Sequence, residues 1–224
     1  MLKWLKYGGL TESSEVTMWN TDPTTLIRDE HEIASLLVRW GYARDSDDWE
    51  TLSACFHEEA TIHISWISGL AKDFVARSRA MATARKPGTH IKHVVSGPWV
   101  RINRDRAFSG CHVTLYDRTI MDGHEFDLQS WFRYFDLLER RDGVWRIVKR
   151  TAVYEKDRID PVDPRGIPKD FFADMDLSAF PPSAKFLCYD LVRNGLSPST
   201  DIISVYSDEE RELREEGEAW LEKP

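Results

Sequence analysis

Two Asp-Gly pairs, Asp122-Gly123 and Asp142-Gly143, limit most strongly what this chain can fold into. Both pairs lie between segments rich in β-branched and aromatic residues, where Asp-Gly is the strongest short-range signal for a β-hairpin. The polar residues 103–106 have the same turn character after a further strand-forming segment. The sequence therefore predicts an antiparallel meander of four strands, which starts near residue 90 and continues over 106–119, 124–140 and 144–156.

The residues before the meander predict helices. In 23–45, apolar residues recur at helical spacing, Pro23 suits the first turn, and Asp22 or Thr24 suits the cap. The elements expected next are a short helix capped by Ser46 or Asp47, a strand at 59–67 and a third helix at 69–88. Helices followed by an antiparallel sheet define an α+β domain, to which we assign residues 23–157.

Two segments flank this domain. Residues 1–22 have a mixed composition and are interpreted as an N-terminal arm. Residues 158–185 are rich in proline and aspartate, which argues against a regular core element, and a charged helix capped by Ser207 follows later. We expect residues 158–224 to pack as an extension on the domain or on a neighbouring subunit.

The composition argues against several classes of protein. A net charge of −8 without a basic stripe disfavours nucleic-acid binding. No apolar run approaches the roughly 20 residues that span a bilayer, and the N-terminus lacks the apolar core of an export signal, so we expect a cytoplasmic protein without membrane contact. Cys55, Cys111 and Cys188 fit no metal motif and are expected to be reduced. The nine tryptophans suit a pocket for a flat apolar ligand.

Two histidines, His90 and His93, open the first strand of the meander. Side chains three residues apart on a strand point to opposite faces, so these two cannot ligate one ion together. The chain also contains no Cys pair or His-Glu-x-x-His run with metal-ligand spacing. We therefore expect no metal site, and we expect one of the two histidines to face the interior.

The three turns indicate which residues share a face of the sheet. If each turn has two residues, His93 lies opposite Tyr116, His112 opposite Arg133, and Trp131 opposite Tyr154. One face then carries His93, His112, Trp131, Arg133 and Tyr154, and buried polar groups of this kind indicate a polar-lined cavity beneath the helices. The alternative is that Arg133 faces outward and His112 is a hydrogen-bonded core histidine. A single β-bulge would also move part of the set to the other face.

Three ordered motifs carry a resemblance to a known family. Residues 40–62 read WGYARDSDDWETLSACFHEEATI, followed later by HVVSGPWVRINRDRAFSG and RRDGVWRIVKR. The first resembles the opening of the SnoaL-like branch of the nuclear-transport-factor-2-like superfamily, with Asp45 and Asp48-Trp49 at its acidic and Asp-Trp positions. The second is similar to the His-led strand and turn of that family, with Arg104 in place of the usual glycine. The third is similar to its closing strand.

The resemblance, which covers about residues 24–156, implies a cone-shaped α+β barrel. Its strongly curved, mixed, mainly antiparallel sheet wraps around a pocket that three helices close. The family includes small enzymes that need no cofactor, such as scytalone dehydratase and hexachlorocyclohexane dehydrochlorinase, in which an Asp at the end of the first long helix pairs with a His on the sheet. Carried onto this chain, the pair is Asp45 and His93, so that His93 faces inward and His90 outward.

The implied activity is that of a cofactor-independent lyase or dehydratase. His93 would act as the base and Asp45 would orient it, because imidazole exchanges protons near neutral pH and a carboxylate fixes its tautomer. The residues expected to line the substrate pocket are Tyr42, Trp66, His112, Trp131 and Arg133, of which His112 or Arg133 would stabilise charge that develops on an oxygen.

We expect the substrate to be a hydrophobic small molecule, with an aromatic one favoured. Water elimination and carbon–carbon cleavage, for example formaldehyde release from a lignin-derived diaryl compound, would use the same groups. The alternatives are a non-catalytic binding or assembly subunit, like the small subunit of a ring-hydroxylating dioxygenase, an isomerase or polyketide-type cyclase, and a metal-dependent enzyme. We also expect a homo-oligomer, a trimer or a dimer, because relatives bury the apolar outer face of the sheet against copies of themselves.

Overall fold

The structure is a computed structural model and describes residues 22–223. The predicted N-terminal arm, residues 1–22, lies outside the described residues except for Asp22. None of the helices formed by residues 22–223 combines the length and the apolar composition that crossing a bilayer requires.

The predicted meander is confirmed as four long antiparallel strands. They are β3 (His90–Asn103), β4 (Arg106–Met121), β5 (His124–Arg141) and β6 (Val144–Pro161). Asp122 and Gly123 have φ values of 50° and 84°, and Asp142 and Gly143 have 51° and 77°. Two consecutive positive φ values are what the favoured two-residue hairpin turn requires, so both Asp-Gly pairs act as the sequence predicts.

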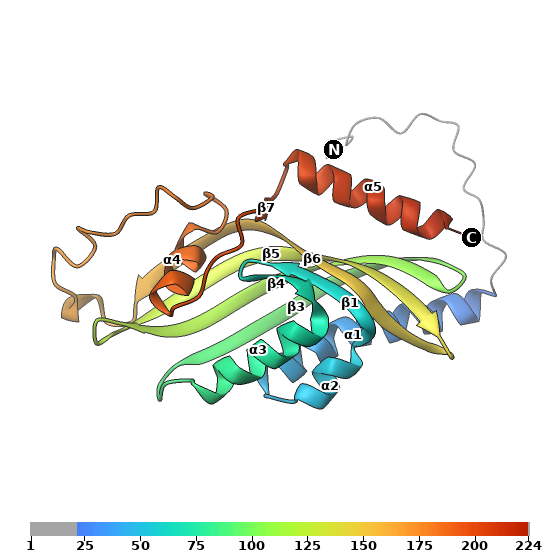
Figure 1. Cartoon of the computed structure of the whole chain (residues 1–224), viewed down its shortest axis with the longest axis horizontal. Helices are drawn as coiled ribbons and strands as arrows, with labels where there is room; N and C mark the ends of the chain where they lie inside the picture. Colours follow the sequence, from blue (N-terminus) through green and yellow to red (C-terminus); the bar gives the residue numbers. More distant parts are fainter. Residues whose placement is uncertain (1–21, 224) are drawn as a thin grey trace, which may run out of the picture.

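Two shorter strands complete the main sheet. β1 (Phe56–Ile64) pairs in parallel with β6, and β2 (Ile67–Leu70) pairs antiparallel with β1. The strand order is β2-β1-β6-β5-β4-β3, and a two-residue strand, β7 (Ile203–Ser204), pairs in parallel with β6. The predicted α+β class with a curved, mixed, mainly antiparallel sheet is confirmed. The sheet is open rather than closed into a barrel (Figure 1).

Three helices cover one face of this sheet, as Figure 1 shows. They are α1 (Pro23–Asp45), α2 (Trp49–Ala54) and α3 (Ala71–Thr83). α1 begins as predicted, since the Asp22 side chain accepts a hydrogen bond from the backbone N–H of Thr25. The cap of α2 is Asp48, one or two residues later than predicted. The apolar stripe of α1 is buried in the main core, with Ile33, Leu36, Leu37 and Trp40 at most 1% exposed.

The C-terminal extension packs on both faces of the same domain. A short 3-10 turn (Pro164–Gly166) is followed by α4 (Lys185–Arg193), which sequence reasoning did not anticipate. α4 adds Leu187, Cys188 and Leu191 to the main core. The predicted terminal helix is α5 (Asp208–Glu222), and the Ser207 side chain caps it as expected.

α5 lies on the face of the sheet opposite to α1–α3 (Figure 1). It covers a second, smaller core in which Leu213 and Leu221 pack with Phe108, Phe135 and Val153. Part of the outer face that we expected to be buried between subunits is therefore covered by the same chain. The homo-oligomer is still a prediction, but the covered part of the outer face no longer argues for it.

β-Bulges change the predicted register in two strand pairs, β3–β4 and β5–β6. The β3–β4 register shifts by one residue between Ser96 and Trp99, so His93 lies opposite Leu115 instead of Tyr116. Two shifts between β5 and β6 place Trp131 opposite Lys156 instead of Tyr154. The predicted pairing of His112 with Arg133 is correct. Because side chains alternate with a period of two, each one-residue shift separates residues that we expected on one face.

Candidate active site

The predicted acid–histidine pair is present at the junction of α1 and β3. Asp45 is the last residue of α1, and its Oδ1 lies 2.6 Å from Nδ1 of His93. The second carboxylate oxygen, Oδ2, accepts a hydrogen bond from the backbone N–H of His93, with 2.5 Å between oxygen and nitrogen. An ionised carboxylate only accepts hydrogen bonds, so Nδ1 carries the hydrogen. Nε2 is then the basic nitrogen, which is the arrangement that a general base requires.

Close packing between the helix and the strand holds this pair. A Cβ atom on Gly41 would lie 3.0 Å from the Val95 side chain and 3.4 Å from the carbonyl oxygen of His93, so glycine permits α1 to approach β3. The ring of Trp40 meets the imidazole edge-on, with centroids 5.8 Å apart. These contacts limit the imidazole to one orientation, and its side chain is only 10% exposed.

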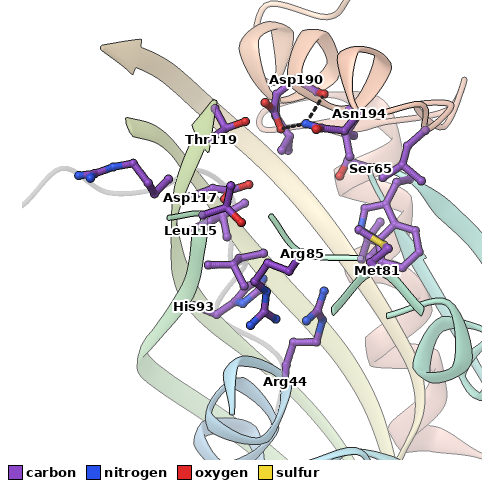
Figure 2. A pocket seen from close by; sticks show the side chains of 18 of the residues that line it. Arg44, Ser65, Met81, Arg85, His93, Leu115, Asp117, Thr119, Asp190 and Asn194 are labelled. Carbon is purple, nitrogen blue, oxygen red and sulfur yellow. Dashed lines mark hydrogen bonds between the residues drawn. The ribbon is translucent and has the colours of Figure 1, made fainter. Parts of the chain in front are cut away.

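His93 lines a cavity of about 560 Å³ between the sheet, α1, α3 and α4. This volume lies within the usual range for small-molecule sites. Much of the wall is apolar, with contributions from Trp40, Trp66, Phe74, Leu115, Phe132 and Leu187. Figure 2 shows α4 at one end of the cavity and the end of α1 at the other. The unanticipated helix therefore closes the site.

A buried ion pair supports the floor of the cavity. The guanidinium of Arg150 donates hydrogen bonds of 2.7 and 2.9 Å to the two oxygens of Asp136, and neither side chain is exposed. The same guanidinium lies 4.4 Å from the ring centroid of Trp40 and 4.2 Å from that of Tyr134. Both rings line the cavity, so this pair fixes the surface on which a ligand would rest.

Only one of the five predicted pocket residues lies in the cavity wall. Trp66 lines the cavity as expected. Tyr42 is 77% exposed on the outer side of α1, so its predicted place in the pocket is wrong. His90 is exposed, and His93 is the inward histidine, as predicted.

The structure also contradicts the predicted pocket positions of His112, Trp131 and Arg133. All three point to the outer face because the shift between β3 and β4 separates them from His93, whereas β4 and β5 pair without a shift. His112 is exposed there, and Trp131 packs under the ammonium of Lys156. Arg133 forms ion pairs with Glu155 at 2.6 Å and with Glu210 of α5 at 3.4 Å. Arg133 therefore joins α5 to the sheet.

Two carboxyl groups in the cavity wall were missed. Asp117 lies on β4 opposite Ile91, and Asp190 lies on α4. The pKa of Asp117 is raised to about 7, mainly by burial and secondly by the negative charge of Asp190. Burial also raises the pKa of Asp190, which accepts a hydrogen bond from Asn194 at 3.1 Å. Near neutral pH Asp117 can therefore hold a proton.

Sequence signals existed for one of these acids. Leu115, Asp117 and Thr119 alternate on β4, and aspartate is depleted in strands, so an inward-pointing Asp117 would have stood out in the correct register. Asp190 belongs to the extension that no motif covered.

The opposite end of the cavity is basic. Arg44 precedes Asp45 in the last turn of α1 and is only 5% exposed. Arg85, in the segment after α3, lines the same cavity and donates hydrogen bonds to Asp47 at 3.0 and 3.4 Å. Figure 2 shows both side chains near His93. Within residues 22–223, no group of three or more His, Cys, Asp or Glu side chains is arranged to hold a metal ion.

This fold and site define a pocket protein of the SnoaL-like kind. The SnoaL-like domain family model matches residues 25–151, which is more than half of the chain, and the chain belongs to this family. It is 34% identical over 176 residues to pea pathogenicity protein 2 of Fusarium vanettenii, with 76% of this chain and 72% of that protein covered. The resemblance seen in the sequence is therefore confirmed.

Two solved structures share the fold. A putative scytalone dehydratase from Novosphingobium aromaticivorans matches with a TM-score of 0.52 and 18% identity, covering 65% of this chain and 99% of that one. A hexachlorocyclohexane dehydrochlorinase matches with a TM-score of 0.53 and 15% identity, covering 65% and 100%. At these identities the likeness concerns the fold, and the chemistry has to be argued from the cavity.

Proposed function

We propose that this protein is a lyase that eliminates water from a hydrophobic, hydroxylated small molecule, with an aromatic one favoured, and that it needs no cofactor. The observation that carries the proposal is the contact between Asp45 and His93 at the wall of a largely apolar cavity. The neighbouring dehydratase and dehydrochlorinase folds are consistent with lyase chemistry in such a cavity.

His93 would act as the general base. Its Nε2 takes a proton from the carbon next to the one that bears the hydroxyl group, and Asp45 stabilises the imidazolium that forms. The second hydrogen bond of Asp45, to the backbone of His93, keeps the carboxylate in place during this transfer. A base and its orienting carboxylate then act as one unit.

Asp117 would act as the general acid. His93 pairs with Leu115 and Asp117 with Ile91, so His93 and Asp117 are diagonal neighbours on adjacent strands, with Cβ atoms roughly 7 Å apart. As the carbon–hydrogen electrons form the new double bond, the carbon–oxygen bond breaks and Asp117 gives its proton to the departing oxygen. Hydroxide is a poor leaving group, so this proton lets it leave as water. The raised pKa of Asp117 supports this role.

After the reaction His93 carries an extra proton and Asp117 lacks one. Transfer through solvent restores both groups, and the atoms balance as substrate to alkene plus water. A second reaction, isomerisation, is favoured by the same protonated Asp117, because a neutral carboxyl group can donate a hydrogen bond to an enolate oxygen. The mass of the product distinguishes the two reactions.

The experiment is a screen of hydroxylated aromatic compounds with mass spectrometry as the readout. The purified protein is expected to convert at least one class to a product lighter by one water. His93→Ala and Asp45→Ala should each lower the rate by roughly 100-fold or more, the range for loss of general acid–base catalysis. His90→Ala is the matched control, since His90 lies on the same strand and is exposed. Rates near wild type in both dyad variants would exclude the proposal.

A further inference from the structure

Arg44 is a buried cation that faces the cavity. It stands in the last turn of α1, and its side chain reaches into the basic end of the cavity, as Figure 2 shows. Its guanidinium lies 5.8 Å from the ring centroid of Trp49, which gives it only a weak aromatic contact. Arginine keeps its charge in proteins, so a positive charge is held in this wall.

Within residues 22–223 no carboxylate forms a direct ion pair with Arg44, although Asp45 and Asp47 partly offset its charge. Among these residues Arg44 forms no ion pair, and its buried Nη1 has no hydrogen-bond partner. The two nearest acids in the sequence are already engaged, since both oxygens of Asp45 bind His93 and Asp47 binds Arg85. A buried charge without a partner is costly, and proteins usually supply one.

The surroundings of Arg44 add positive charge. Burial is the main cause that lowers the pKa of Arg44. The charge of Arg85 acts in the same direction, whereas Asp45, Tyr134 and Asp47 raise this pKa. Lys86, which follows Arg85 in the chain, also lines the cavity. Two guanidinium groups that repel each other are held where an anion between them would relieve the repulsion. This arrangement is typical of an anion-binding site.

We infer that Arg44 and Arg85 form an anion subsite of the cavity and that the ligand of this protein is an aromatic carboxylic acid. A carboxylate matches the planar fork of a guanidinium, and the apolar wall suits the aromatic body. The inference rests on the proposed function in so far as it names the substrate class of the same cavity. The carboxylate would bind at the α1 end and direct the remainder of the molecule past His93 towards Asp117 and Asp190.

Binding, rather than turnover, tests the subsite. The probes are 2-naphthoate and its neutral counterpart 2-naphthamide, titrated into the protein by calorimetry. Naphthoate is expected to bind the wild type roughly 10-fold to 100-fold more tightly than the amide, the range for a charge-assisted pair in a protected site. Arg44→Met, which keeps the length of the side chain without its charge, should lose this preference. Equal affinity of the wild type for the two probes would overturn the inference.

Arg118→Met is the matched control. Arg118 also lines the cavity, but it is already paired with Asp127 at 2.5 Å, so this variant should keep the preference for the acid. Loss of the preference in Arg118→Met together with its persistence in Arg44→Met would also refute the assignment. If Arg44→Met does not fold, Arg85→Gln replaces it, and an unchanged preference in that variant counts against the subsite.

The outcome is separable from that of the proposed reaction. A protein that binds the acid through Arg44 but converts no compound would retain the subsite and lose the lyase proposal. A protein that dehydrates neutral compounds and binds naphthoate and naphthamide equally well would retain the lyase proposal and lose the subsite.

Discussion

Replacing Asp117 by asparagine removes a carboxyl group whose protonation links the stability of the protein to pH. Burial and the neighbouring Asp190 raise the pKa of Asp117 to about 7 in the folded protein, against about 3.9 for an aspartate in an unfolded chain. Between these values the folded state holds a proton that the unfolded chain has released. The stabilisation from Asp117 is therefore fully present below about pH 4 and is lost as the pH rises through 7.

The size of the effect follows from the shift. About three pH units correspond to roughly 4 kcal/mol as an upper limit. Asp117 is half-buried at the wall of a cavity that water can enter, so we expect screening to reduce this to about 2 kcal/mol. An asparagine side chain does not titrate. From pH 4 to pH 8 the free energy of unfolding of the wild type should therefore fall by about 2 kcal/mol relative to that of Asp117→Asn.

Urea unfolding followed by tryptophan fluorescence at five or more pH values measures this difference. Asp174→Asn is the control, because Asp174 is exposed in the extension. The stability of this variant should change with pH in parallel with that of the wild type. Parallel stability curves for the wild type and Asp117→Asn would refute the reasoning, and with it the role of Asp117 as a proton donor.

Two further predictions concern the scaffold. Asp136→Ala leaves the guanidinium of Arg150 buried without its carboxylate, so we expect a loss of about 3–5 kcal/mol in the free energy of unfolding, measured by urea unfolding; a loss below about 1 kcal/mol would contradict the pairing. Gly217→Ala would place a Cβ atom against the ring of Phe108, so α5 should separate from the sheet and become sensitive to limited proteolysis, whereas Gly166→Ala, with open space around it, should not. Equal resistance of the two variants would show that α5 does not depend on this contact.

Much of the fold could be predicted from the sequence because its signals are local. Asp122-Gly123 and Asp142-Gly143 determine two hairpins through their own backbone preferences, and the apolar stripe of α1 is visible within one segment. α4 was missed because its sequence, KFLCYDLVR, follows a proline-rich stretch and is short. Its helical form depends on burial of Leu187 and Leu191 against the sheet, which the segment alone does not reveal.

The site could be predicted only in part because faces depend on register. The Asp45–His93 pair was identified through the family resemblance, and the structure brings the two groups together. The places assigned to His112, Trp131 and Arg133 were wrong because the one-residue bulge in β3 reverses the face of His93 relative to β4 and β5. Gly97-Pro98 at the β3 bulge is a signal that was available, since Gly97 has a φ of 56° and proline lacks the N–H for a sheet hydrogen bond.

Arg44 and Asp190 illustrate a different limit. Arg44 stands in a run of charged residues that reads as a solvated helix end, whereas the folded chain makes it a buried cation at the wall of the cavity. A sequence pattern records which side chains share a face of one element. It does not record which solvent-facing positions a distant segment will later cover.

The central claim is that Asp45 holds His93 with hydrogen on Nδ1 and leaves Nε2 as the base. Nitrogen-15 NMR of the histidine side chains tests this most directly, because long-range couplings to the protons on the ring carbons identify the tautomer of the neutral imidazole. We predict that His93 is the Nδ1–H tautomer in the wild type and loses this fixed tautomer in Asp45→Ala. A wild-type His93 with hydrogen on Nε2 would contradict the account.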